Sequence, residues 1–249
     1  MNFSFLYDGK RYNACDLTRT GGNTRKQKDG VTVNTCVYSL GALRITRETR
    51  VYPFGAQYAL LHFENVSDVS SKQLSDVRDL DETYEFDAPG LPLGYSGYGS
   101  DKYLMLGKMI GSNHSKDEFQ METKPVMDEI PPEFCCRGGR SSQGYAPFFE
   151  LSLRNEGRLF ALGWTGQWRV KITKNQSKTN VCAGVEGVDT FLKPGERIRT
   201  CSVLTMPFCG GLTDAHNKFK SIIKRFFTPH NVQNRELPFF TSFFGGSST

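Results

Sequence analysis

Apolar and polar side chains alternate along most of the first 210 residues of this 249-residue chain. A period of two is typical of β-strands with one buried face, and clusters of Gly, Asn, Asp and Pro separate the alternating runs. The pattern predicts a hairpin at the N-terminus, turning at Asp8-Gly9, a polar loop over 21–30, and a second hairpin turning at Asn155–Gly157. Strands are predicted over 2–7, 31–38, 43–52, 58–63, 74–84, 148–154, 158–168, 169–173, 181–188 and 197–206.

In one stretch, 88–121, closely spaced glycines and prolines interrupt the alternation of apolar and polar residues. Such punctuation predicts a long irregular surface connection, the kind of segment on which binding residues are often found. Its centre is Gly94–Asp101, whose glycines do not follow the spacing of a nucleotide-binding loop. On composition alone, a flexible tyrosine-containing loop remains as good an interpretation as a binding element.

The apolar period changes to that of a helix only near residue 213. Phe219, Ile222, Ile223 and Phe226 follow the i, i+3, i+4, i+7 pattern over 213–229, with Thr213 or Asp214 expected as the N-cap. An aromatic run over 237–244 then predicts a buried strand. A helix and a strand after many strands are typical of the start of an α/β domain, so we expect the sequence to be cut off near the beginning of a second domain.

The run from Arg158 to Trp168 contains both tryptophans of the chain, Trp164 and Trp168. In a continuous strand these indoles lie on the same face, with Gly166 leaving a gap between them. Two plates with a gap suit a sugar ring, but large aromatic side chains are more often buried. Core packing is therefore favoured over ligand contact.

Composition and charge exclude several classes of function. The 31 basic and 26 acidic residues leave a formal charge of +5, and no basic helix interleaved with aromatic residues is present, which disfavours nucleic-acid binding. No apolar run reaches the ~20 residues that cross a bilayer, so no membrane contact is expected. The N-terminus lacks the basic start of a signal peptide. The seven cysteines include no zinc-type spacing and are expected to be free thiols, which fits a cytoplasmic location.

No catalytic constellation can be read from the spacing of residues. The four histidines match no metal motif, no nucleophile elbow occurs, and no cofactor is indicated. A glycosidase needs two converging carboxylates, and no spacing selects a pair among the acidic residues, which are expected to be solvated. The candidates considered are Asp101, Glu150, Glu186 and Asp189.

Three motifs nevertheless resemble the N-terminal domain of bacterial family 36 glycoside hydrolases, the α-galactosidases and their relatives. The resemblance rests on Cys136–Ser142 (CRGGRSS), Pro147–Leu151 (PFFEL) and Ala161–Trp168 (ALGWTGQW). It is extended by similar stretches at 184–196, at 213–229 with His216-Asn217, and at 238–246. The similarity covers about the C-terminal two thirds of the chain, whereas the part before Asp87 fits only by its strand pattern.

This resemblance implies an all-β fold, a large antiparallel β-supersandwich of the galactose-mutarotase type. It implies a sandwich over 1–209, a linker helix over 210–230 and, over 231–249, one orphan strand of a (β/α)8 barrel. Family members are retaining enzymes with two aspartates on later barrel strands, so no catalytic residue carries over. What carries over is a glycine-rich aromatic loop that walls the sugar pocket, and the substrate-binding residues implied are Tyr95, Tyr98, Ser100 and Phe244. Relatives more often have tryptophan at the aromatic positions.

The resulting hypothesis is a fragment that supports the pocket of an enzyme for terminal α-galactosides, inactive alone. Two alternatives stay open: a stand-alone carbohydrate-binding sandwich, and a structural or oligomerisation domain. Phe239, Phe240, Phe243 and Phe244 favour the last, because an orphan aromatic strand tends to self-associate, so a homo-oligomer is possible.

Overall fold

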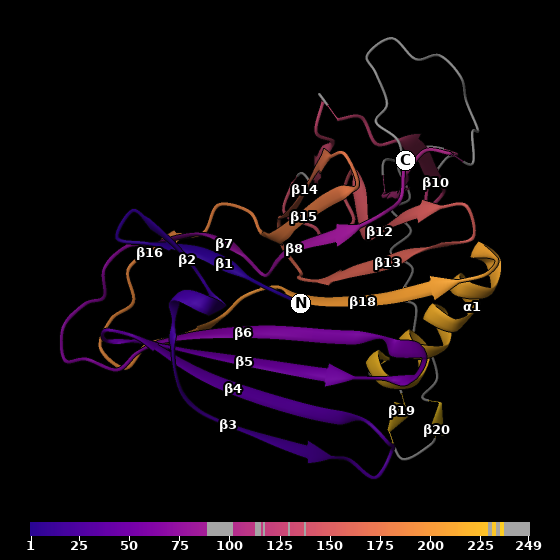
Figure 1. Cartoon of the computed structure of the whole chain (residues 1–249). Coiled ribbons are helices and arrows are strands. Elements are labelled where there is room, and N and C mark those ends of the chain that lie inside the picture. Colours follow the sequence, from indigo (N-terminus) through magenta and orange to yellow (C-terminus); the bar gives the residue numbers. More distant parts are fainter. Residues whose placement is uncertain are drawn as a thin grey trace, which may run out of the picture.

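The computed structural model describes residues 1–88, 102–112, 116, 118–128, 130–136, 138–228, 231–232 and 235–236. Within them the chain is built almost wholly from antiparallel β-strands, with one α-helix near the C-terminal end (Figure 1). The all-β prediction is therefore confirmed. The predicted strand over 237–244 lies outside the described residues, and the division into domains at 209/210 and 230/231 stays a prediction.

The largest sheet described is a twisted ten-stranded sheet, which we call the central sheet. Its strands run in the order β10-β9-β12-β13-β18-β6-β5-β4-β3, and β17 also pairs with β6. They are β3 (Thr18–Lys26), β4 (Thr32–Leu40), β5 (Leu43–Val51), β6 (Gln57–Asn65), β9 (Met105–Ile110), β10 (Met121–Pro125), β12 (Tyr145–Leu153), β13 (Glu156–Gly163), β17 (Arg197–Arg199) and β18 (Ser202–Cys209).

Two four-stranded sheets lie against one face of the central sheet. One has the order β16-β7-β1-β2 and the other β11-β14-β15-β8. Their strands are β1 (Ser4–Tyr7), β2 (Lys10–Asn13), β7 (Leu74–Arg78), β8 (Leu80–Glu85), β11 (Glu133–Cys135), β14 (Trp168–Asn175), β15 (Lys178–Val185) and β16 (Asp189–Thr190). Short helical turns follow β2 and β5, at η1 (Ala14–Asp16) and η2 (Pro53–Gly55), and β19 (Asn231–Val232) pairs with β20 (Arg235–Glu236).

The core between these layers follows the alternation of the strands. In β13, Phe160 and Leu162 face the β14–β15 sheet, and the rings of Phe149 and Phe160 stack 4.5 Å apart. At the other end, Phe5 of β1 meets Phe63 of β6 edge to face at 5.1 Å. Burying many large side chains in this way supplies most of the favourable free energy of folding.

Helix α1 (Leu212–Ile222) covers the opposite face of the central sheet and continues as a π-helical turn, η3 (Ile223–Phe227). Its buried residues Ala215, Phe219 and Ile222 pack on a cluster that includes Leu159 and Leu204, the β13 and β18 residues that alternate away from the other core. The predicted amphipathic helix is thus confirmed. Its predicted cap is wrong, because the helix begins one residue earlier, at Leu212, and Gly211 occupies the N-cap position in an extended conformation.

Predictions for three segments of the β-rich region are wrong, each for a physical reason. The predicted polar loop over 21–30 is mostly the edge strand β3, which is exposed on both faces and so carries no alternating pattern. The predicted single strand over 74–84 is two strands in different sheets, divided at the buried Asp79. The irregular connection over 88–121 includes β9, in which Gly107 leaves room for the side chain of Glu150.

Candidate functional site

The four predicted substrate-binding residues, Tyr95, Tyr98, Ser100 and Phe244, lie outside the described residues. Their role therefore stays a prediction. Two other features can be placed: the tryptophan motif and a cavity beside α1.

The tryptophan motif does not form one continuous strand. β13 ends at Gly163, residues 164–167 form a bend, and β14 begins at Trp168 in a different sheet. Trp168 is completely buried, and its Nε1–H donates a hydrogen bond to the carbonyl oxygen of Ser141 at 2.7 Å. Trp164 is half-buried, with the guanidinium of Arg199 5.8 Å from its ring centroid. The prediction of one continuous strand over 158–168 is wrong. The core interpretation is confirmed for Trp168, and Trp164 packs, partly buried, against the same core cluster.

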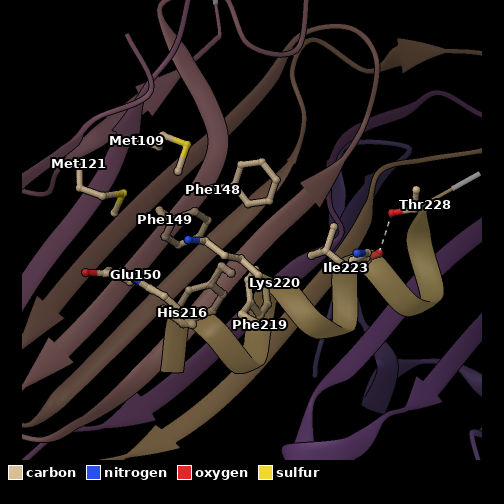
Figure 2. Close-up of a pocket in the computed structure, with 13 residues that line it drawn as sticks. Met109, Met121, Phe148, Phe149, Glu150, His216, Phe219, Lys220, Ile223 and Thr228 are labelled. Atoms are coloured by element: carbon tan, nitrogen blue, oxygen red, sulfur yellow. Dashed lines mark hydrogen bonds and ion pairs between the residues drawn. The ribbon is translucent and has the colours of Figure 1, made fainter. Parts of the chain in front are cut away.

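A cavity of about 480 Å³ lies between α1 and the uncovered part of the central sheet (Figure 2). Its walls come from β9, β10, β12 and β13 on the sheet side and from α1 and η3 on the helix side. The lining is mainly apolar: Met109, Met121, Phe148, Phe149, Leu159, Phe160, Phe219 and Ile223. A concave apolar space of this size falls in the usual range for small-molecule sites, about 300–1,000 Å³.

One pair of polar side chains, Glu150 and His216, interrupts the apolar lining of the cavity. Nε2 of His216, on α1, lies 2.6 Å from Oε2 of Glu150, on β12. The Glu150 side chain is 3% exposed and that of His216 is 34% exposed. The expectation that the acidic candidates are solvated is therefore wrong for Glu150, whereas Glu186 and Asp189 are exposed as expected. The fourth candidate, Asp101, lies outside the described residues.

Gly107 makes this pair possible. A Cβ at Gly107, which pairs with Glu150 across β9 and β12, would come 2.7 Å from Glu150 Cγ and 2.8 Å from Oε1. The Glu150 carboxylate can lie over the sheet only because residue 107 is a glycine and has no side chain. A buried carboxylate without a partner is costly, and the imidazole of His216 supplies one.

Among the described residues, the cavity lining supplies only one carboxylic acid. Glu150 is the only acidic residue among the described residues that line it, and retaining or inverting hydrolysis uses two carboxylic acids. Lys220, Lys224 and Thr228 complete the wall, and the Thr228 hydroxyl donates to the carbonyl oxygen of Ile223 at 3.3 Å. The Glu150–His216 pair thus links α1 to the central sheet.

No group of three His, Cys, Asp or Glu side chains among the described residues is arranged to hold a metal ion. All seven cysteines are described, and each is a free thiol, as predicted. No helix of the described residues has both the length and the apolar character of a membrane span.

Sequence reasoning treated Glu150 and His216 separately and missed their contact. The two are 66 residues apart, so no spacing rule links them. A usable signal was an acid inside the apolar run Phe148–Leu151 together with a histidine three residues before Phe219 on the apolar side of the predicted helix.

No protein-family model matches the sequence, and the comparison with curated proteins gives no match. Solved structures do match. An α-galactosidase from Lactobacillus brevis superposes with a TM-score of 0.67 at 15% identity over 90% of this chain. The chain shares its fold with a region of family 36 α-galactosidases.

Two further structures agree with this. A family 36 α-galactosidase from Geobacillus stearothermophilus, solved with stachyose, has a TM-score of 0.66 at 15% identity, and covers 90% of this chain. The galactosidase domain of an α-galactosidase–sucrose kinase has a TM-score of 0.66 at 14% identity, also over 90%. The present chain spans only 31% of the Lactobacillus protein and 32% of each of the other two.

Proposed function

We propose that this chain is the β-sandwich region of a retaining glycoside hydrolase acting on terminal α-galactosides. In this proposal the region shapes the substrate pocket and supports assembly of the enzyme, and it supplies no catalytic group. The observation that carries the proposal is the shared fold over 90% of the chain, combined with a span of less than a third of the Lactobacillus enzyme.

The motifs add independent support. The Ala161–Trp168 motif ends in the fully buried Trp168, which hydrogen-bonds to Ser141 of the GGRSS motif. Two of the three motifs that carry the sequence resemblance are therefore in direct contact in this fold.

The contribution to the pocket is proposed for the tyrosine-glycine loop. Aromatic rings stack on the apolar C–H face of a sugar, and Tyr95 and Tyr98, with Ser100 beside them, have the chemistry for this contact. Phe244 is proposed to add a further apolar surface.

The first test uses the purified chain and a chromogenic α-galactoside. Because the proposal assigns both catalytic aspartates to a region beyond this chain, we expect no turnover above the uncatalysed rate. Turnover by the chain that survives repurification would contradict the proposal.

A calorimetric titration with galactose separates the proposal from a stand-alone sugar-binding domain. We expect no measurable binding by the chain alone, since one wall of a pocket rarely binds a sugar. Binding that is lost in Tyr95→Ala and Tyr98→Ala but kept in Tyr98→Phe would favour the binding domain instead.

A further inference from the structure

A second, polar crevice of about 310 Å³ lies on the outer face of the β14–β15 hairpin. Its sides are β7 and β11, and its floor is the face of β14 and β15 that points away from the core. Arg169, Lys171 and Thr173 alternate along β14, so all three side chains lie on this face. The crevice is thus floored by two basic groups and a hydroxyl.

The close approach of β7 to β15 depends on Gly184, which faces Arg169 across the hairpin. A Cβ there would come 2.7 Å from the carbonyl oxygen of Val77. This approach brings Asp76 and Arg78 of β7 to the edge of the crevice.

Basic side chains from three sheet strands gather around Asp76. Its carboxylate forms ion pairs with Arg11 of β2, with Arg78 at 3.2 Å and with Arg169 of β14. Asp76 itself has φ of 42°, a left-handed conformation that is unfavourable for a residue other than glycine. Strain of this kind is retained where the surrounding contacts require it.

A second carboxylate, Asp81, is also engaged. It pairs with Arg78 at 3.4 Å and accepts hydrogen bonds from the Ser4 hydroxyl at 2.6 Å and the Asn180 amide at 3.1 Å. Two carboxylates therefore face three guanidinium groups, and Lys171 adds a fourth positive charge. Glu133 lies 3.8 Å from Lys171, and both side chains are more than half exposed, so solvent screens that pair.

The crowding of positive charge has an electrostatic signature. Burial lowers the pKa of Arg11, and the neighbouring charge of Arg78 lowers it further. A guanidinium also has five N–H donors, and the ion pair of Arg169 with Asp76 is made at Nη2, so a single carboxylate does not use all the donors of Arg169.

We propose that this crevice binds a phosphate- or sulfate-type oxyanion carried by a small molecule, with Arg78, Arg169 and Lys171 as its cationic ligands. Planar guanidinium groups bind such oxyanions through paired hydrogen bonds, and Lys171 contributes a point charge. The volume of about 310 Å³ exceeds that of an inorganic ion and accommodates a phosphorylated sugar-sized molecule. The proposal does not depend on the function proposed above.

The test is a calorimetric titration of the full chain at low salt with inorganic phosphate and, separately, with glucose 6-phosphate. We expect saturable binding that weakens as sodium chloride is added, because salt screens the charges. In Arg169→Gln the dissociation constant should rise about tenfold, the loss of one charge-assisted contact.

Two further variants keep the test decisive. Lys171→Gln leaves the Asp76 ion pairs untouched and should also weaken binding, which guards against misfolding of Arg169→Gln. Arg199→Gln removes the same charge beside Trp164 and should leave binding unchanged. Tighter binding of glucose 6-phosphate than of phosphate would identify the ligand as a phosphorylated molecule. Equal affinity for the two probes would identify the ligand as a free oxyanion. No saturable binding of either probe, or equal weakening in all three variants, would overturn the proposal.

Discussion

Asp79 is a carboxylic acid enclosed between β7 and β8, and it is 2% exposed. Burial raises its pKa to about 7, although hydrogen bonds from the Thr200 hydroxyl and from the backbone N–H groups of Val185 and Cys201 act in the opposite direction. Oδ2 has no hydrogen-bond partner within the described part of the chain. The carboxyl is therefore more easily kept neutral than charged.

This gives a prediction for stability against pH. The native pKa lies above the unfolded value of about 3.9, so the folded state holds a proton that the unfolded state releases between these values. The contribution of this proton to the free energy of unfolding is complete below about pH 4 and is lost as pH rises towards 7. In that range the free energy of unfolding falls by up to about 1.4 kcal/mol per pH unit. Asp79→Asn cannot ionise and should lose this dependence, as measured by urea unfolding at about pH 5 and pH 8.

Asp68→Asn is the matched control, since Asp68 is exposed. The wild type and Asp68→Asn should lose stability together between the two pH values, with Asp79→Asn losing less. Identical pH dependence in all three proteins would show that Asp79 is already ionised in the folded state.

Gly107 gives a second prediction at the level of a single residue. Gly107→Ala places a methyl group 2.7 Å from Glu150 Cγ and forces the carboxylate to move, at a cost of about 1–3 kcal/mol. Gly21→Ala, in the exposed edge strand β3, is the control, since the nearest atom to the Cβ it would add is Val37 Cβ at 3.9 Å, an ordinary contact. Thermal unfolding should show a lower midpoint for Gly107→Ala than for Gly21→Ala, and equal midpoints would disprove the steric argument.

At the scale of elements, the Glu150–His216 pair joins α1 to the central sheet across 66 residues of sequence. His216→Ala should destabilise the protein by about 2–3 kcal/mol, because Glu150 is then left buried beside an apolar cavity. Glu150→Gln keeps the shape and a polar group, and should cost less.

A double-mutant cycle of these two changes, followed by urea unfolding, measures the coupling between them. We expect the effect of His216→Ala to shrink by more than about 0.5 kcal/mol in the Glu150→Gln background. Additive effects would mean that the two side chains act independently and do not hold the helix.

Elements with one buried face were predictable from the sequence, and the others were not. β4, β5, β6 and the amphipathic helix α1 were found because their apolar period reflects a single covered face. β3 was missed because both of its faces are exposed, and its basic residues Arg19, Arg25 and Lys26 are typical of a protected sheet edge. The break at Asp79 was missed because only the tertiary structure makes a buried acid tolerable there.

The candidate sites show the same limit. The glutamate and histidine of the α1 cavity, and the arginines around Asp76, come from strands and a helix far apart in sequence. Their residue types were visible, but the contacts arise from sheet order, which alternation does not specify.

For the whole molecule, the proposed function makes this β-sandwich one part of a larger enzyme, and the arrangement of its layers bears on that proposal. One face of the central sheet is covered by two smaller sheets, and the other is partly covered by α1, which leads towards the C-terminal end of the chain (Figure 1). The proposed function assigns catalysis to a region beyond the chain. In this proposal the sandwich positions that catalytic region.

The most direct measurement follows the reading frame past Thr249 and assays the longer protein beside the present chain. The substrate is an α-galactoside, and proton NMR reports the anomer formed first. We predict that the longer protein releases α-galactose with retention, that mutating either of two barrel-strand aspartates abolishes this, and that the present chain is inactive. A longer protein without such aspartates, or one that folds and does not hydrolyse the substrate, would contradict the account.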